Sequence, residues 1–439
     1  MVVLVGNFGD PRGKFSFSKS RRELHNMRHF SASHGARKAD KGITPSTLIA
    51  PFSQNLYHSL YIMQVADVLT QGVEAVLPDK SSLEKLMSTK KIRVYFGVDP
   101  TGPKLHLGHT IPLRKLQQFA DLGHEAILLF GTGTVLAGDP SQRQEARKPI
   151  TPEQIEENIK DWRRQASKVI DFEKVKIKQN GDWLLPLTTA QILEIASNIS
   201  SIQLYKREMF QRRIEKGDTV STSETLYPLF QGYDSVYLDV DLEIGGTDQV
   251  FNMLIGRELQ KKMKGREKYV LTTPLISGTD GAQMTKSTGN CIWLDDSPQE
   301  MYGKIMSTAD AQIEPYWTLL TNLDKAKLKS LKPLDAKKEL AHEIVKMYHS
   351  QRDADTAQQN FENTVQKGQA PTNILEVKVK EGITLSDFVA TQVESKSEAK
   401  RLIDQNAIEI DGEVIASSKT EVKSGQVIKI GKKKFVRIK

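Results

Sequence analysis

Tyr95-Phe-Gly-Val-Asp-Pro-Thr-Gly-Pro-Lys-Leu-His-Leu-Gly-His109 is the segment that decides the fold of this 439-residue chain. Residues 93–98 alternate as a strand does, which places Tyr95 and Gly97 on one face and the apolar residues between them on the other. Asp99-Pro-Thr then ends the strand in a turn, and a helical pattern follows as far as a stop at Gly123. A strand that turns directly into a helix is the repeating unit of a doubly wound α/β sheet, which binds ligands at such turns.

His106 and His109 follow this turn and are three residues apart, so they lie on one face of the helix that begins there. Gly108 opens space beside the backbone, and Gly97 lets a planar group approach the strand closely. Two histidines at this spacing are usually ordinary surface residues, and no acidic or cysteine partner stands at the spacing of a metal site. Because helix N-termini favour phosphate, the whole setting instead predicts a nucleotide-type site.

Further segments repeat the alternation of strand and helix. Ala126–Phe130 is a continuous apolar run, as expected of a strand buried on both faces. Thr151-Pro-Glu-Gln154 is a capping box with proline at the first helical position. Residues 175–177, 236–240 and 269–271 are predicted as further strands. The chain is therefore predicted to contain a Rossmann-like, doubly wound parallel sheet with helices on both faces.

The composition fits an ordinary globular protein, with 38% hydrophobic and 26% charged residues. No run of about 18 apolar residues occurs, so no membrane contact is expected. The single cysteine, Cys291, permits neither an internal disulfide nor a cysteine-based zinc cluster. A net charge of +8 is consistent with a polyanionic partner such as RNA, although many globular proteins carry as much charge.

Changes of pattern along the chain predict three domains behind a leader. The domains are a Rossmann-like domain over residues 63–296, a wholly helical domain over 297–370 and a small α+β domain over 380–439. The first opens with helical spacing at Val65, Val68 and Leu69, and again at Val73, Val76 and Leu77. Residues 1–62 are rich in Ser, His, Arg and Lys, poor in acids, and expected to be disordered.

Two interpretations of residues 1–62 compete. One is an organellar transit peptide, which is typically rich in Arg and Ser and poor in acids. The other is sequence upstream of a true start at Met63, which we favour slightly because residues 1–10 make a poor amphipathic presequence. The second interpretation predicts a cytoplasmic protein.

His106-Leu-Gly-His109 resembles the His-Ile-Gly-His signature of the class I aminoacyl-tRNA synthetases. Their second signature, Lys-Met-Ser-Lys-Ser, is similar to Gln283-Met-Thr-Lys-Ser287, where glutamine replaces the first lysine. In that family the two motifs flank the ATP triphosphate. The resemblance therefore assigns catalytic roles to His106, His109, Thr285, Lys286 and Ser287. It assigns ATP contacts to Gly97, Asp99, Thr101, Gly108, Gly246, Asp248 and Lys286.

Tyr227-x-x-x-Gln231-x-x-Asp234 falls on one face of a helix and is followed by Glu243-Ile-Gly-Gly-Thr-Asp-Gln249. Both patterns resemble the tyrosyl-tRNA synthetases. In that family the positions of Tyr95 and Asp234 hydrogen-bond the substrate phenol, and those of Asp139, Tyr227 and Gln231 hold its ammonium group. Thr134 matches a position near the ammonium group, and Gln249 one in the amino-acid pocket. Such a site rejects phenylalanine because its buried polar groups would be left unpaired.

Asp139-Pro-Ser-Gln-Arg143-Gln-Glu-Ala-Arg147 is a basic loop that resembles the family's Gly-Asp-Pro-Ser segment. Basic residues at the positions of Arg143 and Arg147 touch the developing pyrophosphate in that family. The resemblance therefore adds both arginines to the expected catalytic residues, although surface arginines are often only solvated.

The C-terminal segment resembles an S4 domain, a small RNA-binding module of bacterial-type tyrosyl enzymes. Ser395-Lys-Ser-Glu398 is a capping box before a buried helical stripe, and strand–turn–strand patterns follow. Basic residues lie off that stripe and in the final segment. We expect RNA phosphates to contact them, with an affinity that falls steeply with salt. The expected RNA-binding residues are Lys396, Lys400, Arg401, Lys432, Lys433 and Lys434.

The resemblance implies a tyrosine–tRNA ligase that uses L-tyrosine, ATP with Mg²⁺ and tRNA(Tyr), has no tightly bound cofactor or metal of its own, and forms a homodimer. Two alternatives stay open. Tryptophanyl-tRNA synthetases share the fold and signatures, but not the S4 domain or the pair Tyr95 and Asp234. A non-catalytic protein that binds structured RNA on a synthetase scaffold is favoured only by Gln283.

Overall fold

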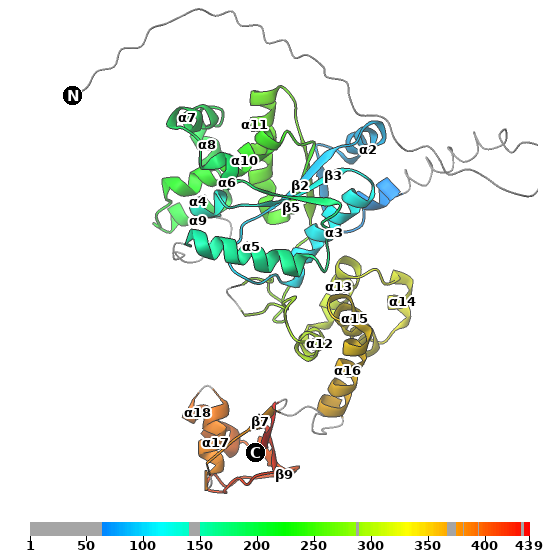
Figure 1. Cartoon of the computed structure of the whole chain (residues 1–439), viewed down its shortest axis with the longest axis vertical. Coiled ribbons are helices and arrows are strands. Elements are labelled where there is room, and N and C mark those ends of the chain that lie inside the picture. Colours follow the sequence, from blue (N-terminus) through cyan, green and yellow to red (C-terminus); the bar gives the residue numbers. More distant parts are fainter. Residues whose placement is uncertain are drawn as a thin grey trace, which may run out of the picture. The chain divides into compact units, whose positions relative to one another are not determined.

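A computed structural model describes residues 64–139, 150–286, 289–366, 375–380, 382–393, 395–431 and 434–439. The leader predicted for residues 1–62 lies outside these ranges. The described residues contain a six-stranded sheet and a five-stranded sheet, which belong to different domains (Figure 1). No helix within the described ranges is long and apolar enough to cross a lipid bilayer.

The first sheet has the strand order β1-β6-β5-β2-β3-β4. Its strands are β1 (Ala75–Leu77), β2 (Arg93–Val98), β3 (Glu125–Phe130), β4 (Val175–Gln179), β5 (Leu242–Gly246) and β6 (Tyr269–Thr273). Strands β2 to β6 run parallel, as predicted, and only β1 is antiparallel, at the edge beside β6. The chain runs outward from β2 to β4 and then returns to β5 on the other side of β2. The β2/β5 boundary is therefore the topological switch point of the sheet.

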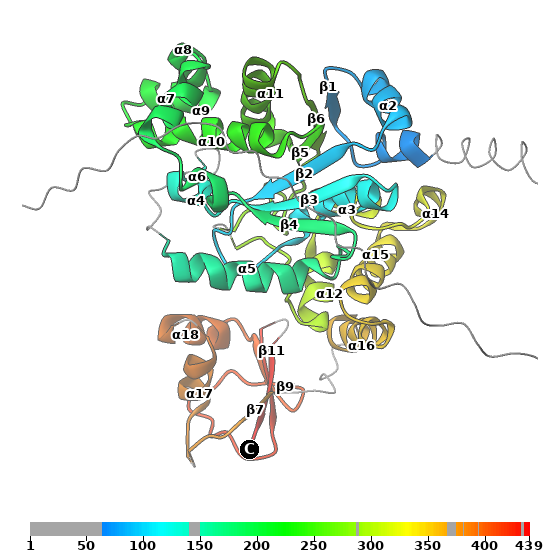
Figure 2. The ribbon, with the colours of Figure 1, turned by 45° about the horizontal axis from the view of Figure 1, so that its top comes forward.

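Helices cover both faces of this sheet (Figure 2). Val94 and Phe96 pack into the core with α3 (Leu107–Asp121) and α5 (Pro152–Ala166), whereas Tyr95 packs on the other face. The predicted alternation along β2 is thus confirmed. The second face is covered by α6 (Gly181–Leu184), α10 (Thr222–Leu238) and α11 (Val250–Lys264). The other helices of the domain are α2 (Lys80–Thr89), α4 (Thr134–Ala137), α7 (Thr189–Ser197), α8 (Ser201–Tyr205), α9 (Glu208–Glu215) and η2 (Thr247–Gln249).

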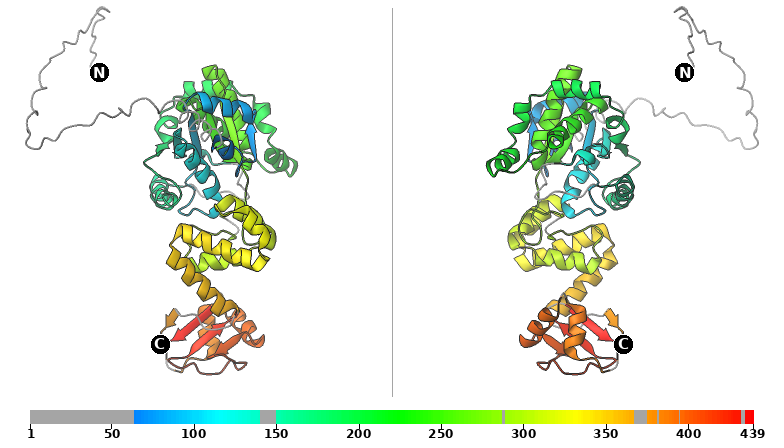
Figure 3. Two further views of the ribbon diagram at one scale, coloured as in Figure 1. Left: turned by 90° about the vertical axis from the view of Figure 1, so that its right-hand side faces the viewer. Right: turned by 90° about the vertical axis from the view of Figure 1, so that its left-hand side faces the viewer.

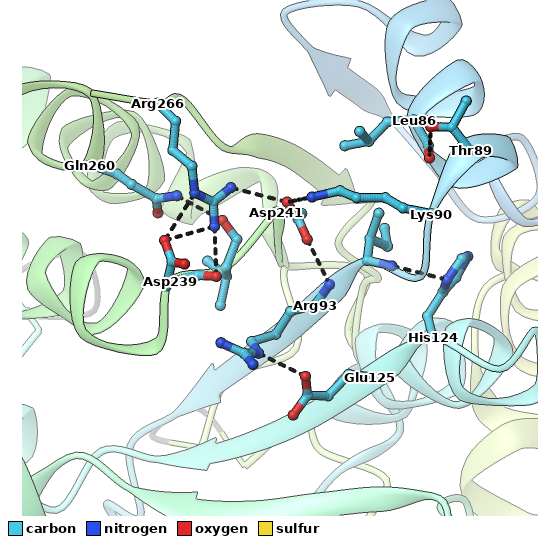
Figure 4. Close-up of polar contacts among 12 residues, drawn as sticks. Leu86, Thr89, Lys90, Arg93, His124, Glu125, Asp239, Asp241, Gln260 and Arg266 are labelled. Carbon is cyan, nitrogen blue, oxygen red and sulfur yellow. Dashed lines mark hydrogen bonds and ion pairs between the residues drawn. The ribbon is translucent and has the colours of Figure 1, made fainter. Parts of the chain in front are cut away.

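Charged residues join the N-terminal ends of the same strands (Figure 4). The buried carboxylate of Asp241, just before β5, accepts hydrogen bonds from the Arg93 backbone N–H at 2.9 Å and the Lys90 ammonium at 2.7 Å. Arg266 donates to the same carboxylate at 3.0 Å, and the Arg93 guanidinium pairs with Glu125 of β3. This network holds β2, β3 and β5 together at the edge opposite to the predicted ligand site.

The chain is helical from Pro298 to Gln366, as predicted, and Figure 3 shows these helices packed together. The predicted capping box is confirmed, because the Ser297 hydroxyl accepts a hydrogen bond from the Glu300 backbone N–H at 3.3 Å. The buried side chains of this domain join the core that also contains α3. Its elements are α12 (Pro298–Ser307), η3 (Asp310–Gln312), α13 (Ile313–Leu320), α14 (Lys325–Ser330), α15 (Pro333–Tyr348), α16 (Gln351–Phe361) and the π-helical turn η4 (Glu362–Gln366).

The C-terminal domain has its own hydrophobic core, between a sheet of order β7-β11-β10-β8-β9 and two helices. Its elements are β7 (Leu375–Val377), α17 (Leu385–Gln392), α18 (Lys396–Asp404), β8 (Ile408–Ile410), β9 (Glu413–Val414), β10 (Val427–Ile430) and β11 (Lys434–Ile438). The predicted cap of α18 is confirmed, since Ser395 Oγ accepts from Glu398 N at 3.1 Å. Strand β7 pairs with β11, so the sheet includes residues that precede the predicted range of 380–439.

The strand predicted at residues 236–240 is wrong, because α10 continues to Leu238. Val236, Leu238 and Val240 are buried, whereas Tyr237 and Asp239 are exposed. The end of this helix and the turn after it therefore reproduce the two-residue period of a strand, and the true strand is β5.

The helical pattern predicted near Met63 is confirmed only in part. Val65, Val68 and Leu69 are buried in the core, and residues 64–68 are helical. Val76 and Leu77, however, belong to β1, where pairing with the edge of β6 outweighs the local periodicity.

Substituting Asp241→Ala should lower the free energy of unfolding by about 1–3 kcal/mol, because it removes a buried acceptor and leaves the part-buried Arg93 backbone N–H unpaired. Chemical denaturation followed by circular dichroism measures this change. Asp121→Ala is the matched control, because Asp121 pairs with Lys174 on the surface and such pairs contribute little. Equal stability of the two variants would contradict the structural role of the Asp241 network.

Candidate active site

His106 and His109 lie together at the start of α3, next to the C-terminal end of β2. His106 is the N-cap residue of the helix, and its backbone N–H donates to His109 Nδ1 at 3.1 Å. The two ring centroids are 3.8 Å apart. A Cβ atom on Gly108 would lie only 3.0 Å from the His106 ring, so a larger residue here would press on that imidazole. The predicted juxtaposition of the two histidines is therefore confirmed.

Both imidazoles are uncharged near neutral pH. Burial lowers the pKa of His106 to about 3, with a further contribution from the Lys286 ammonium. Burial also lowers the pKa of His109 well below its usual value, and the His106 ring and Lys286 act in the same direction. Since His109 Nδ1 accepts a hydrogen bond, its own proton must be on Nε2. The pair can thus donate hydrogen bonds to a ligand without bringing positive charge of its own.

Lys286 joins the two distant signature motifs in one site. Its ammonium lies 3.3 Å from Thr101 Oγ1, in the turn after β2, and 4.6 Å from the centre of the Trp162 ring. The Trp162 ring also makes an edge contact with His109, at 5.4 Å between centroids. The predicted residues Thr101, His109 and Lys286 therefore surround one place, where a fixed positive charge faces two neutral imidazoles.

Backbone pairing explains why the Lys286 loop lies here. The Leu107 N–H donates to Ile292 O at 3.0 Å, and the Leu294 N–H donates to Leu105 O at 2.9 Å. This short antiparallel contact brings the end of the loop beside the histidine motif. The buried Asn290 side chain organises the loop, accepting from Thr285 N at 3.1 Å and donating to Gln283 O at 3.0 Å. Gln283 is exposed.

A second polar cluster lies around Asp99, at the end of β2. The Tyr227 hydroxyl donates to Asp99 Oδ2 at 3.0 Å, and the Thr134 hydroxyl donates to Oδ1 at 2.8 Å. Burial raises the pKa of Tyr227 well above its usual value, as does the nearby Asp99 charge, so this phenol stays protonated. Gly131 is required for the contact, because a Cβ atom would overlap both Asp99 and Thr134. Asp99, predicted to contact ATP, thus belongs structurally with the residues predicted near the ammonium group.

Asp234 occupies a buried pocket on α10. Its two carboxyl oxygens accept hydrogen bonds from Asn180 Nδ2 at 3.0 Å and from Trp183 Nε1 at 2.9 Å. Burial raises the pKa of Asp234 well above its usual value, although the hydrogen bonds from Asn180 and Trp183 oppose this shift. Asn180 also donates to Thr134 at 3.0 Å, which links this pocket to the Asp99 cluster. The carboxyl group is therefore fixed in position and orientation.

Tyr95 lies beside this pocket on β2. Its hydroxyl and the hydroxyl of Ser235 are hydrogen-bonded at 3.0 Å. Burial raises the pKa of Tyr95 well above its usual value, and the charges of Glu243 and Asp234 add to the effect. Tyr95 and Asp234, predicted to share one ligand hydroxyl, are thus close enough to influence each other. Gln231 lies on α10, one helical turn before Ser235, and donates to Glu243 Oε1 at 3.1 Å.

Asp139, Asp248 and Gln249 form the third part of the site. Gln249 Nε2 donates to Asp139 Oδ2 at 2.9 Å and to Asp248 Oδ2 at 3.2 Å. The buried Arg207 guanidinium lies 3.9 Å from Asp139 Oδ1, and burial lowers its pKa although Asp139 opposes the shift. Its Nη1 atom is buried without a hydrogen-bond partner. Arg207 thus compensates part of the negative charge of the cluster and keeps an unused donor.

Two glycines keep the strand ends accessible. Gly97 is exposed although Val94, Tyr95 and Phe96 before it in β2 are buried, so the backbone beside Tyr95 is accessible at this point. Gly246 is required by its neighbour, because a Cβ atom would come within 2.4 Å of Asp248 Oδ1.

Several predicted residues lie elsewhere or beyond the description. Arg143, Arg147, Ser287, Lys432 and Lys433 lie outside the described residues. On the C-terminal domain, Lys396, Lys400 and Arg401 are exposed on α18, and Arg401 pairs with Glu398 at 2.6 Å. Lys434 is also exposed and donates to the Gln392 carbonyl. The predicted RNA-binding side chains that the structure describes are thus on the surface.

Sequence reasoning missed four contributors to the site: Asn180, Trp183, Arg207 and Ser235. It also missed the buried Lys268, whose ammonium contacts Ser235 and Glu243. Asn180 directly follows β4, so the rule that ligands bind at the ends of parallel strands could have found it. Lys268 precedes β6 and lies at the opposite end of its strand, so no such rule applies. Arg207 lies between two short helices and carries no pattern of its own.

Two family models match the chain. The model described as "tRNA synthetases class I (W and Y)" matches residues 87–366, and the S4 domain model matches residues 387–428. The first match covers strands β2 to β6 of the sheet and the helical domain, and the second lies within the C-terminal domain.

Curated relatives are similar over nearly their whole length. The tyrosine–tRNA ligase of Thermotoga maritima is 40% identical over 385 residues, which are 84% of this chain and 96% of the relative. The tyrosine–tRNA ligase of Desulfotalea psychrophila is 42% identical over 363 residues, or 79% and 90% of the two chains.

Solved structures show the same fold at lower identity. A truncated mitochondrial tyrosyl-tRNA synthetase of Aspergillus nidulans has a TM-score of 0.58 at 22% identity and covers 70% of this chain and 98% of its own. The tyrosyl-tRNA synthetase of Archaeoglobus fulgidus complexed with L-tyrosine has a TM-score of 0.54 at 23% identity, covering 68% and 99%. With these matches and the site described above, the chain belongs to the class I aminoacyl-tRNA synthetases and, within them, to the tyrosyl-tRNA synthetases.

Proposed function

We propose that the chain is an active tyrosine–tRNA ligase that activates L-tyrosine with ATP and transfers it to tRNA(Tyr). The observation that carries this proposal is the buried pair of Tyr95 and Asp234 beside the cluster of His106, His109 and Lys286. The first pair fits a phenol, and the second cluster fits a polyphosphate. Both stand at the switch point of the sheet, where a doubly wound fold holds its ligands.

The phenol of tyrosine would lie between the Tyr95 hydroxyl and the Asp234 carboxyl. Asn180 and Trp183 each use an N–H group on Asp234, so a further acceptor direction is left for the substrate hydroxyl. A phenylalanine ring would leave these buried groups without a hydrogen-bond partner, and water cannot easily take its place. The binding free energy of phenylalanine is therefore less favourable than that of tyrosine. We assign the ammonium group to the carboxylates of Asp99 and Asp139, with Tyr227, Thr134 and Gln231 around them.

In the first reaction a carboxylate oxygen of tyrosine attacks the α-phosphorus of ATP. The bond from this phosphorus to the bridging oxygen breaks, and pyrophosphate leaves. The protein's task is to place both reactants in line and to stabilise the negative charge of the transition state. His106 and His109 would donate neutral hydrogen bonds, and Lys286 would supply the positive charge. Mg²⁺, arriving on ATP, would neutralise part of the pyrophosphate charge.

In the second reaction a hydroxyl of the terminal tRNA ribose attacks the carbonyl carbon of the adenylate, and AMP leaves. Asp248, in η2 just after β5, would hold the adenylate ribose next to Gly246. We assign tRNA binding outside this site to the helical domain and to the exposed basic residues of α18. The glutamine at position 283 removes one cation from the family's loop signature, and Arg143 and Arg147 are the proposed compensating charges.

We also propose that the enzyme is a homodimer, which sedimentation equilibrium would measure. Large apolar side chains are exposed at the end of α6 and on α7, α8 and α10: Leu185, Leu193, Ile202 and Tyr237. Where such side chains form a contiguous patch, the patch is suited to contact with a second copy of the chain.

A cytoplasmic location is our proposal for the compartment, because the curated relatives described above are bacterial. Mass spectrometry of the mature N-terminus would test it. Removal of residues 1–62 at a processing site would instead favour an organelle.

Amino-acid-dependent exchange between ATP and pyrophosphate tests the proposed function. Purified full-length protein should exchange label with tyrosine and neither with phenylalanine nor with tryptophan. Exchange driven by tryptophan would favour the sister enzyme. A folded protein that binds tRNA but exchanges with none of the three would support the non-catalytic alternative.

The variant Asp234→Ala should reduce kcat/KM for tyrosine in this exchange about 100-fold or more, since it removes a buried acceptor and leaves two donors unpaired. The KM for ATP should stay within about twofold, because Asp234 belongs to the phenol pocket and not to the phosphate cluster. Near-normal use of tyrosine by a folded variant would contradict the pocket assignment.

Deleting residues 375–439 should spare adenylate formation but weaken tRNA charging, because this domain has a hydrophobic core of its own. Charging by the intact enzyme should also become weaker as salt rises, through loss of phosphate contacts. Equal loss of adenylate formation and charging in the truncated enzyme would show that the domains do not act separately.

A further inference from the structure

Lys268 is a fully buried lysine that the proposed reaction does not use. Its exposed fraction is 0%, and it precedes β6 on the same side of the sheet as α10 and α11. A buried ammonium is costly unless charged and polar partners surround it. Its partners therefore indicate what the position does.

The Lys268 ammonium connects two groups of the amino-acid pocket. It donates to Ser235 Oγ at 2.5 Å and forms an ion pair with the Glu243 carboxylate. Ser235 is the hydrogen-bond partner of the Tyr95 hydroxyl, and Glu243 accepts from Gln231. Ser235 thus connects the Lys268 ammonium to Tyr95, which is assigned to the phenol. Glu243 likewise connects it to Gln231, which is assigned to the ammonium group.

The backbone around the ammonium is shaped to admit it. A Cβ atom on Gly256 of α11 would lie only 2.6 Å from Lys268 Nζ and 3.2 Å from Ser235 Oγ. A Cβ atom on Gly232 of α10 would lie 3.1 Å from the Cα atom of Gly256. Facing glycines therefore allow the two helices to approach closely while leaving room for the lysine between them and the sheet.

We propose that Lys268 is a positioning residue that sets tyrosine selectivity by orienting the Tyr95 hydroxyl through Ser235 and the Gln231 amide through Glu243. This inference rests on the proposed function and adds a residue that never touches the substrate. Its physical basis is donor and acceptor choice. Because the ammonium can only donate, Ser235 must accept from it, and the Ser235 proton points elsewhere.

That constraint biases the polarity of the next hydrogen bond. With one lone pair of its oxygen occupied by Lys268, Ser235 has its own proton for either the Tyr95 oxygen at 3.0 Å or Glu243 Oε2 at 3.5 Å, and the shorter contact favours Tyr95. The Tyr95 proton can then be donated to a substrate oxygen in place of Glu243, and the Asp234 carboxyl remains the acceptor for the substrate proton. A phenol satisfies both, whereas a phenyl ring satisfies neither.

The same pair orients Gln231. Glu243 accepts from Gln231 Nε2, which leaves Gln231 Oε1 buried without a partner. An amide oxygen that is fixed in this way is an acceptor for the substrate ammonium group. Through Ser235 and Glu243, Lys268 thus orients the groups that bind the two ends of the amino acid.

The test compares Lys268→Met with Lys115→Met in tyrosine- and phenylalanine-dependent pyrophosphate exchange. Lys115 is the matched control, because its ammonium is also buried and donates to Val68 O, Gln71 O and Gln118 Oε1, away from the pocket. Both variants should lose stability. Only Lys268→Met should raise the KM for tyrosine and lower the tyrosine-to-phenylalanine ratio of kcat/KM, each by about tenfold or more, with the KM for ATP unchanged.

A second variant separates positioning from folding. Lys268→Met combined with Glu243→Met replaces the whole buried ion pair with apolar side chains, an exchange that often restores stability. The double variant should melt near the temperature of the unmodified enzyme and still discriminate poorly between tyrosine and phenylalanine.

Unmodified selectivity in the folded double variant would overturn the inference, as would equal effects of Lys268→Met and Lys115→Met on selectivity. These outcomes would leave the proposed function intact. Absence of tyrosine-dependent exchange in the unmodified enzyme would instead overturn the proposed function, and the inference with it.

Discussion

The site depends on one topological constraint, which is that β2 lies between β3 and β5 with all three strands parallel. Parallel strands end at the same edge, and the reversal of winding between β2 and β5 leaves that edge uncovered by a crossover helix. Asp99 after β2, Asn180 after β4, and Gly246 and Asp248 at and after β5 therefore converge although they are distant in sequence. The Asp241 network closes the opposite edge, so ligand chemistry and strand alignment are assigned to different ends of the same sheet.

Electrostatics decide what can bind at this edge. Carboxyl groups dominate the amino-acid side of the site, and few cations compensate them: Arg207 beside Asp139, and Lys268 beside Glu243. The nucleotide side has the opposite character, because Lys286 is charged while burial keeps both histidines neutral. This separation of charge matches two ligands. The ammonium group of a zwitterionic amino acid would face the carboxylates, and a polyphosphate would face Lys286. Burial makes each match stronger than it would be in water.

Much of this arrangement can be predicted from the sequence, because signature motifs fix both spacing and local structure. The histidine pair, the helix face of Tyr227, Gln231 and Asp234, and the caps at Thr151, Ser297 and Ser395 all occur where the pattern places them. These features are local, so side-chain period and capping chemistry are enough.

The features that escaped prediction are nonlocal or ambiguous in period. Residues 236–240 alternate like a strand only because a helix ends there, and Val76 and Leu77 form a strand only because β6 pairs with them. Lys268 and Arg207 form their ion pairs with residues that are more than 20 and 60 positions away in the sequence, respectively. The resemblance assigns Asp99 to the nucleotide, whereas its hydrogen bonds with Tyr227 and Thr134 link it to the amino-acid pocket.

The most direct measurement is a crystal structure of the full-length protein with a non-hydrolysable tyrosyl-adenylate analogue. The account predicts that the phenol oxygen lies within hydrogen-bond distance of both Tyr95 Oη and Asp234, with the ammonium group among Asp99, Asp139 and Tyr227. It also places the phosphate replacement near His106, His109 and Lys286. An analogue bound in the reverse direction, or with its phenol away from Asp234, would contradict the account.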